Sequence, residues 1–258
     1  MAFRGELWTA LKKFGTKSGR WVVLAALLGG PGGMTFYVLG VQKIGASFTA
    51  TISSIFPAVG ALFAFLILRD KLSLKNWVGL LISIGFTIAL SYSGNLITGS
   101  SVSLGLIFVL FCILGWGLEA VIAGYGMKDE EVSPYQALFI RQLTSALTFA
   151  IIIIPIFVGH KLTIQVAQTS TFWFIALIAF FGTLSYICYY VAINLIGPIR
   201  AMALNISYVA FAILISVFFL GQQFSMKNVI FALCIMAGAV LAVVPDNKKA
   251  TELEGKVA

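Results

Sequence analysis

The sequence is poor in charge. Asp, Glu, Lys and Arg make up 10% of its 258 residues, while hydrophobic residues make up 60%. A soluble domain is typically about 25% charged and about 45–50% apolar. The apolar residues form runs of about 18–25, which is the length that an α-helix needs to cross a bilayer. The composition therefore excludes an ordinary soluble domain and predicts an all-α polytopic membrane protein.

Side chains for catalysis or metal binding are also scarce. His160 is the only histidine and is a weak site candidate in a polar loop, and the three cysteines (Cys112, Cys188 and Cys234) lie in apolar runs without the spacing of a metal site. The motifs HExxH, GxSxG and CxxC are absent, as is GxxxxGK followed by Ser or Thr. We therefore expect no enzyme, no cofactor and no metal, and we interpret the cysteines as small buried thiols.

Turn residues and charges divide the apolar region into eight expected spans, at roughly 21–43, 46–68, 77–94, 104–126, 134–157, 172–195, 199–220 and 228–245. Residues 1–20 carry five basic residues and no long apolar run, so we expect a cytoplasmic basic segment there and no signal peptide. Residues 246–258 are expected to form a cytoplasmic tail.

The basic residues predict the orientation of the spans. With the N-terminus in the cytoplasm, 13 Lys and Arg fall on the cytoplasmic side, three fall outside (Lys43, Lys161 and Lys227), and Arg141 lies within a span. Because cytoplasmic loops retain an excess of basic residues, we expect both termini inside, in a bacterial cytoplasmic (inner) membrane. The basic residues are scattered along the chain, so the net charge of +8 does not indicate a nucleic-acid partner.

The chain repeats itself at a constant offset of 152 residues, so that 21–81 aligns with 173–233 without a gap. Identical pairs include Trp21 with Trp173, Gly30 with Gly182, and Tyr37 with Tyr189. The two copies start five expected spans apart, and an odd number makes them run in opposite directions. We therefore expect two inverted repeats, a partial one of three spans at 21–98 and a second of five spans at 104–245. Inverted repeats are the usual architecture of secondary transporters.

Glu119 and Arg141 are the only acid and base expected deep inside a span. An ionised side chain at the bilayer centre costs at least about 2.5–3.5 kcal/mol, so each must pair, change protonation or face a cavity. Both are expected about 10–12 Å from the same cytoplasmic boundary, within ion-pair reach or facing a common cavity. Either Glu119 binds a proton or a cationic group and Arg141 an anionic one, or the two are a static ion pair, or Arg141 reaches the headgroups.

Neutral polar and aromatic residues gather in the sixth and seventh spans, at Ser185, Tyr186, Tyr189, Tyr190, Asn194, Asn205, Ser207 and Tyr208. The spacing of four between Tyr186, Tyr190 and Asn194 places them on one helix face. Asn194 and Asn205 are costly in lipid unless they are hydrogen-bonded. Tyr186, Tyr190, Asn194 and Asn205 therefore line a substrate cavity or form hydrogen bonds between helices. Trp116 is either an interfacial anchor or a cavity wall.

Two features predict irregular helices. Gly29-Gly30-Pro31-Gly32-Gly33 lies in the middle of the first span. We interpret Gly30, Pro31 and Gly32 as a weakened or broken helix that serves as a hinge or borders a cavity, the alternative being close helix packing. Pro57 removes a backbone donor and can kink the second span.

The stretch from Tyr37 to Leu90 resembles the EamA-type repeat of the drug/metabolite transporter superfamily. The matching residues are Gly45-Ala46-Ser47, Thr49-Ala50, Pro57 and Arg69-Asp70-Lys71-Leu72-Ser73. Asp70 stands where the family usually has a glutamate. The second copy matches more loosely, at Gly197-Pro198 and Gly221 to Ser225, and Arg141 stands where the family often has an arginine. The resemblance covers about residues 21–245 and says almost nothing about the substrate.

The resemblance implies ten spans, five in each repeat, around a central cavity. This chain matches only the last three spans of the first repeat, so we expect it to lack the first two. The implied function is secondary transport, as an exporter of small organic metabolites by alternating access, with proton coupling through Glu119 as a hypothesis. The rival hypothesis is a truncated or partner-dependent membrane protein that does not transport alone, in which a homodimer or another partner replaces the missing helices.

Overall fold

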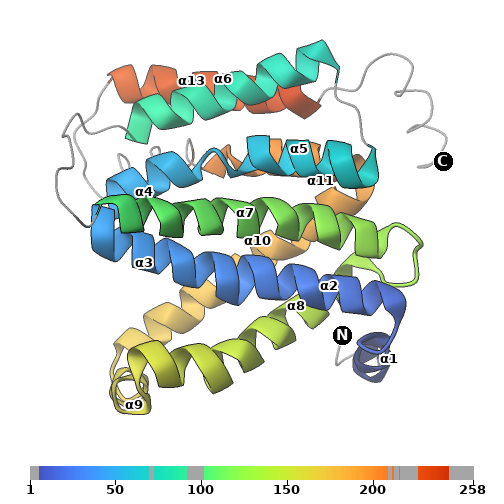
Figure 1. Cartoon of the computed structure of the whole chain (residues 1–258), viewed down its shortest axis with the longest axis vertical. Coiled ribbons are helices and arrows are strands. Elements are labelled where there is room, and N and C mark those ends of the chain that lie inside the picture. The colour runs from blue at the N-terminus through green and yellow to red at the C-terminus, as the bar shows by residue number, and fades with distance from the viewer. Residues whose placement is uncertain are drawn as a thin grey trace.

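The computed structural model consists of helices packed in layers (Figure 1). It describes residues 6–69, 73–91, 102–208, 211, 215 and 226–243. Within these ranges every element is a helix and none is a strand. The all-α class that the apolar runs predict is therefore confirmed.

The first repeat and the segment before it contain one long helix and four shorter ones. After α1 (Glu6–Lys13), a single helix runs from Lys17 to Ile44 in three parts: α2 (Lys17–Leu27), the π-helical η2 (Leu28–Gly33) and α3 (Met34–Ile44). It is followed by α4 (Ala46–Ser53), α5 (Phe56–Leu68) and α6 (Leu74–Ser91).

The second repeat starts with α7 (Val102–Met127) and α8 (Pro134–Thr148), and α8 continues as the π-helical η3 (Phe149–Val158). The helices that follow are α9 (His160–Ala167), α10 (Thr171–Ile196), α11 (Pro198–Asn205) and α13 (Met226–Val243). In Figure 1, α6 and α13 form the layer at one end of the molecule, α8 and α9 lie toward the opposite end, and α10 runs from α9 to the middle of the molecule.

Four helices in the described ranges are long and apolar enough to cross a membrane: Lys17–Ile44, Val102–Met127, Pro134–Val158 and Thr171–Ile196. Two details differ from the sequence expectation. The first of these helices begins at Lys17, because Thr16 caps it by accepting a hydrogen bond from the Gly19 N–H at 3.1 Å. The polar segment at 159–170, expected to be a loop, contains α9. The expected span at 199–220 lies partly outside the described residues, which after Tyr208 include only Phe211 and Ile215 of this span.

The glycine-rich stretch weakens its helix without breaking it. Gly30, Pro31 and Gly32 lie in η2, where π-helical turns carry the chain past the missing backbone donor of Pro31. Gly30 and Pro31 are buried. In this conformation the stretch therefore serves close helix packing, which was the alternative to a hinge. A hinge at these residues stays a prediction.

Each repeat does interrupt a helix, and it does so at equivalent positions. In the first repeat α4 ends at Ser53, and Pro57 lies in the first turn of α5. The expected second span is thus interrupted directly before Pro57, which lies in the first turn of the helix that follows. In the second repeat α11 ends at Asn205, 152 residues after Ser53. Both short helices follow a glycine with positive φ, 82° at Gly45 and 85° at Gly197, a conformation that glycine adopts at little cost.

The last described helices of the two repeats, α6 and α13, pack side by side in opposite directions (Figure 1). Near the start of α6, Asn76 Nδ2 donates to the carbonyl of Leu241, near the end of α13, at 3.2 Å. In the middle, Ser83 Oγ donates at 3.0 Å to the carbonyl of Ile235, which is its own counterpart at the offset of 152. Contact between equivalent residues of antiparallel helices is what two inverted repeats require. The exact boundaries of the repeats stay a prediction.

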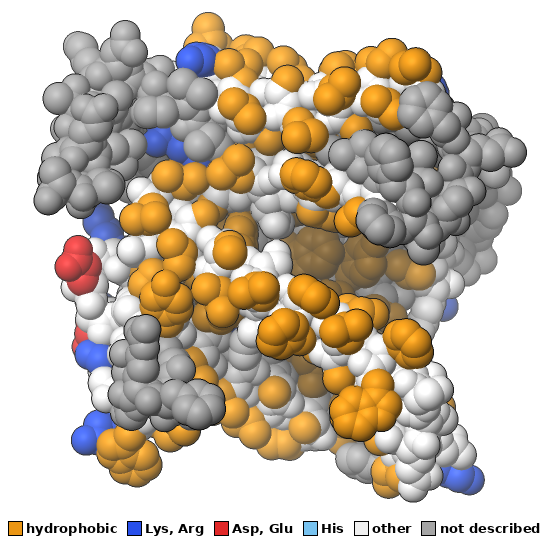
Figure 2. Space-filling view, turned by 180° about the vertical axis from the view of Figure 1, so that it is seen from behind, with side chains coloured by type: hydrophobic (Ala, Val, Ile, Leu, Met, Phe, Trp, Pro, Cys, Tyr) orange, Lys and Arg blue, Asp and Glu red, His pale blue; other side chains and the backbone are white. Residues whose placement is uncertain are grey.

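The surface agrees with a bilayer environment. The face in Figure 2 is largely hydrophobic, and its described charged side chains lie toward the two lateral edges. Large apolar side chains are exposed on many helices, for example Leu66 (62%), Ile151 (68%) and Leu233 (60%). In water such a surface would be an aggregation liability, whereas lipid covers it without penalty.

Candidate functional site

A buried ion pair lies between α7 and α8. Arg141 Nε donates to Glu119 Oε1 at 2.9 Å, and the two residues are 9% and 5% exposed. The sequence predicted this approach, and the structure confirms it. A buried charge is strongly unfavourable without a partner, so each residue stabilises the charged form of the other.

Side chains of α10 and α8 complete the hydrogen bonding of the pair. Tyr190 Oη donates to Glu119 Oε1 at 3.3 Å, and Arg141 Nη2 donates to Tyr186 Oη at 3.1 Å. Arg141 Nη1 donates to Gln142 Oε1 at 2.9 Å. The guanidinium carbon also lies 4.2 Å from the centre of the Tyr186 ring, within the range of a cation–π interaction. The pair is thus held from three helices, which fixes its geometry.

Glycines in η2 let the neighbouring helices come this close. Gly29 lies directly against the carboxylate of Glu119, and Gly30 lies against Ser145 Oγ. A Cβ atom at either position would collide with that neighbour. The small side chains that the sequence places in the middle of the first span therefore serve the packing around the ion pair.

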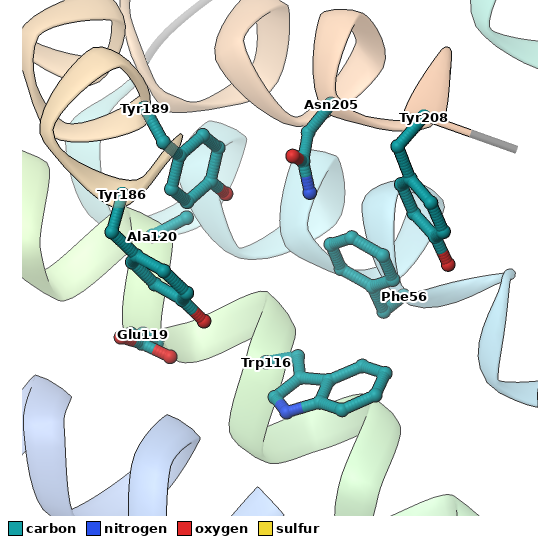
Figure 3. A pocket seen from close by; sticks show the side chains of 8 residues that line it. All are labelled: Phe56, Trp116, Glu119, Ala120, Tyr186, Tyr189, Asn205 and Tyr208. Atoms are coloured by element: carbon teal, nitrogen blue, oxygen red, sulfur yellow. The ribbon is translucent and has the colours of Figure 1, made fainter. Parts of the chain in front are cut away.

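A cavity of about 140 Å³ lies beside Glu119. Its lining comes from both repeats: Phe56 belongs to the first, and Trp116, Glu119, Ala120, Tyr186, Tyr189, Asn205 and Tyr208 belong to the second. Figure 3 shows these side chains arranged around one space, with the Asn205 amide directed into it from α11. An engineered cavity of about 150 Å³ in another protein holds benzene, so this cavity has room for a small solute.

Aromatic rings make up most of the cavity wall. The ring of Trp116 stacks on Tyr37 with centroids 5.3 Å apart and meets Phe56 edge-on at 5.8 Å. At the offset of 152, Tyr37 is the counterpart of Tyr189 and Phe56 is the counterpart of Tyr208. Equivalent positions of the two repeats therefore place aromatic rings at the same site.

The structure brings most of the predicted site residues together. Glu119, Tyr186 and Asn205 line the cavity, while Arg141 and Tyr190 lie behind that wall as partners of Glu119. Their roles in substrate binding stay predictions.

Asn194 does not join the site. It is exposed, whereas Tyr190, one turn earlier in α10, is fully buried. Positions spaced by four drift by about 40° per step around an α-helix, so the face shared by Tyr186 and Tyr190 has turned outward by Asn194.

The sequence analysis also named some of the other residues that line the cavity. It gave Trp116 a cavity wall as one alternative and named Tyr189 and Tyr208 among the polar and aromatic residues of the sixth and seventh spans, and all three line the cavity. It missed Phe56 and Ala120. The available signal for Phe56 was its repeat relation to Tyr208, together with the adjacent Pro57.

The cavity lining carries little charge. Among the described residues that line the cavity, Glu119 is the only charged one, and Arg141 faces this carboxylate and the Tyr186 ring from behind. Within the described ranges no group of three His, Cys, Asp or Glu side chains could hold a metal ion. This arrangement can bind a small partly apolar solute, and Glu119 supplies the one group that could exchange a proton or meet an opposite charge.

Comparison with known proteins points to a single family. The model of the EamA-like transporter family matches residues 2–92 and 103–244. Protein LicB of Haemophilus influenzae is 34% identical over 223 residues, which are 84% of this chain and 73% of LicB. The matched ranges of the family model include the ion pair and every residue that lines the cavity.

Proposed function

Because the chain belongs to the EamA-like transporter family, we propose that it is a secondary transporter that moves a small organic metabolite by alternating access through the cavity beside Glu119. The family is one of membrane transporters of small solutes, and its members are integral membrane proteins. The binding site, the coupling and the direction of transport are the parts that we add.

The observation that carries this proposal is the position of the cavity. It lies where the two repeats meet, and its wall combines Phe56 of the first repeat with residues of the second. A charged pair inside an apolar protein is expensive, so its presence in a membrane span is by default a sign of a functional site. Here the pair borders the cavity instead of facing lipid.

The helix interruptions supply a way to open the cavity on either side. Ser53 and Asn205 end short helices at equivalent positions of the two repeats, and Asn205 itself lines the cavity. Interrupted helices near the substrate are a common device of transporters built from inverted repeats. Exchanging the conformations of the two repeats would open the cavity first to one side and then to the other.

We further propose that transport is export and that Glu119 couples it to protons. The test uses liposomes that contain the purified chain and are loaded with a metabolite extract of the host cells, with mass spectrometry identifying the solutes that leave. A pH gradient should change the efflux rate, and Glu119→Gln should remove that dependence. Glu130→Gln, which changes an exposed loop acid, is the matched control and should behave like the wild type.

Two results would each overturn a different part of these proposals. Flux that ignores the pH gradient and survives Glu119→Gln removes proton coupling and the role of the carboxylate. Absence of protein-dependent flux of any solute, with the chain correctly folded, removes transport by this chain alone.

The proposed location is the bacterial cytoplasmic membrane with both termini inside. The support is the distribution of basic residues, 13 on the proposed cytoplasmic side against three outside. The charged side chains toward the two lateral edges of the face in Figure 2 are compatible with either orientation, so the assignment rests on the sequence.

A second candidate function is a subunit that needs a partner to transport. The observation in its favour is the exposure of α10, in which Trp173, Phe174 and Ile175 are 74%, 67% and 49% exposed. Consecutive helical residues point about 100° apart, so this part of α10 is uncovered over most of its circumference. Lipid, a second copy of the chain or another membrane protein could surround it. The oligomeric state in nanodiscs, compared with the flux of each species, distinguishes these arrangements.

A further inference from the structure

A second hollow lies on the surface of the protein, at the start of α2. It is an open groove of about 450 Å³, lined by Gly15, Lys17, Arg20, Trp21 and Leu24. Its two cations thus come directly before an aromatic and an aliphatic side chain, where the first helix that is long enough to cross a membrane begins. Lys17 and Leu24 are seven residues apart, or about 10 Å along a helix. The groove therefore changes from cationic to apolar over the depth at which a bilayer changes from headgroups to acyl chains.

The two cations of the groove are available to bind an anion. Lys17 and Arg20 are both exposed, and neither forms an ion pair with another described residue. The nearby carboxylate of Glu131 accepts a hydrogen bond from the Ser18 N–H at 3.2 Å and does not line the groove. The Gly19 N–H is also occupied, because it donates to the side chain that caps α2. An anion in the groove would therefore be bound by side chains and not by the end of the helix.

The helix α1 continues this surface with an amphipathic pattern. Leu7, Trp8 and Leu11 are spaced by one and three residues, so they share one side of α1, and all three are exposed, Trp8 at 68%. Thr9 and Lys13 point to the opposite side. A basic amphipathic helix of this kind lies in the membrane interface, with its apolar side toward the acyl chains and its basic residues toward the headgroups.

We propose that the groove binds the headgroup of an anionic phospholipid and that α1 lies in the membrane interface beside it. Lys17 and Arg20 contact the phosphate of this lipid. Trp21 and Leu24 contact its glycerol and the first carbons of its acyl chains. The groove shares no lining residue with the cavity beside Glu119, so the inference is separate from the proposed transport.

The chemistry of the groove favours this occupant over two others. A soluble anion such as free phosphate would leave Trp21, Leu24 and the apolar side of α1 uncovered. A zwitterionic lipid would bring an ammonium group to a groove in which no described acid balances it. An anionic lipid satisfies both parts, and basic segments at the end of a membrane span are a known means of attracting such lipids.

The first test measures lipid binding to the purified full chain by native mass spectrometry. The probes are phosphatidylglycerol, phosphatidylcholine with the same acyl chains, and the soluble glycerol phosphate. We expect phosphatidylglycerol to bind at least about tenfold more tightly than phosphatidylcholine, since each basic side chain near a membrane surface contributes about fivefold. Equal binding of the two lipids, or displacement of phosphatidylglycerol by an equimolar amount of glycerol phosphate, overturns the proposal.

Substitutions then locate the site. Lys17→Gln combined with Arg20→Gln should weaken phosphatidylglycerol binding by about 5- to 30-fold and leave phosphatidylcholine binding unchanged. Lys43→Gln combined with Lys161→Gln removes two exposed charges outside the groove. This matched control has the same net charge and should bind like the wild type. A folded groove variant that binds like the wild type, or an equal loss in both double variants, shows that the groove is not the site.

Spin labels test the position of α1. Leu11→Cys and Thr9→Cys, on opposite sides of α1, are each labelled with a nitroxide in a chain whose native cysteines are replaced by serine, in nanodiscs that contain phosphatidylglycerol. Oxygen concentrates among the acyl chains, whereas a nickel chelate stays in water. We expect the label at 11 to be more accessible to oxygen and the label at 9 to the chelate. Equal access of the chelate to both labels would show that α1 lies in water and would overturn its interfacial position.

Discussion

The helix of Lys17–Ile44 and its repeat counterpart α10 have related sequences and opposite surroundings. Gly30 in the first packs against Ser145 of α8, while the equivalent Gly182 in α10 has no described atom within 4 Å of where its Cβ would lie. Trp21 is 36% exposed and its counterpart Trp173 is 74% exposed. The first helix is covered by α7 and α8, and within the described residues α10 has no equivalent pair of helices on its outer face.

The difference shows that the repeated sequence pattern determines the local helix, whereas the packing of that helix depends on the helices beside it. Both helices keep glycine at the same place, but only one uses it to approach a neighbour. The ion pair and the cavity lie near the first helix, which α7 and α8 cover. There α7 contributes Glu119 and Trp116. The exposed half of α10 faces lipid or a further membrane segment, and its aromatic residues suit either surrounding.

Removal of one member of the ion pair should cause the largest loss of stability. Arg141→Met leaves the Glu119 carboxylate buried without its cation, and we expect about 3–5 kcal/mol less stability in detergent unfolding. Glu119→Leu combined with Arg141→Met should recover most of this loss without restoring transport. An Arg141→Met variant as stable as the wild type would contradict a buried, mutually stabilised pair.

Replacing each of the two equivalent glycines by alanine should change the stability by different amounts, because their surroundings differ. Gly30→Ala forces a Cβ against Ser145 Oγ, and we expect a loss of about 1–3 kcal/mol from overpacking. Gly182→Ala meets open space and should be neutral or stabilise α10 by up to about 1 kcal/mol through helix propensity. The comparison of thermal unfolding in nanodiscs measures both. A loss at Gly182 as large as that at Gly30 would show that a partner covers α10.

A smaller effect on stability is expected at the N-terminal ends of the two helices, α2 and α10. At the start of α2 the Ser18 N–H donates to Glu131 Oε2 at 3.2 Å, and hydrogen bonds from Ser18 lower the pKa of Glu131 from its ordinary value of 4.5. At the start of α10, Ser170 makes no side-chain cap.

A lowered carboxyl pKa stabilises the folded state above the ordinary pKa, and the contribution disappears as the pH falls through the folded value. Glu131→Gln should therefore lower the melting temperature slightly at pH 7, and the difference should disappear as the pH falls below 4.5 and through the lowered pKa of Glu131. A difference that stays constant between pH 7 and pH 3 would rule out this role of the carboxylate.

Much of the fold could be predicted from the sequence because the apolar runs and the offset of 152 are strong signals. The pairing of Glu119 with Arg141 was also predictable, since burial in lipid leaves each charge few alternatives. Phe56 could not be assigned from its own residue type, because a phenylalanine in an apolar span faces lipid as readily as a cavity. Asn194 was misplaced because four-residue spacing holds a face over one turn and then rotates away.

The claim on which the account depends is that the two repeats cross the bilayer in opposite directions and meet at the cavity. Lys75 lies in the first turn of α6 and Lys227 in the first turn of α13, and the start of α6 lies beside the end of α13. Lys75→Cys and Lys227→Cys, each in a chain whose native cysteines are replaced by serine, can be labelled in intact cells with a membrane-impermeant maleimide. The account predicts that Cys at 227 is labelled from outside and that Cys at 75 is labelled only after the membrane is opened. Labelling of both positions from the same side would contradict it.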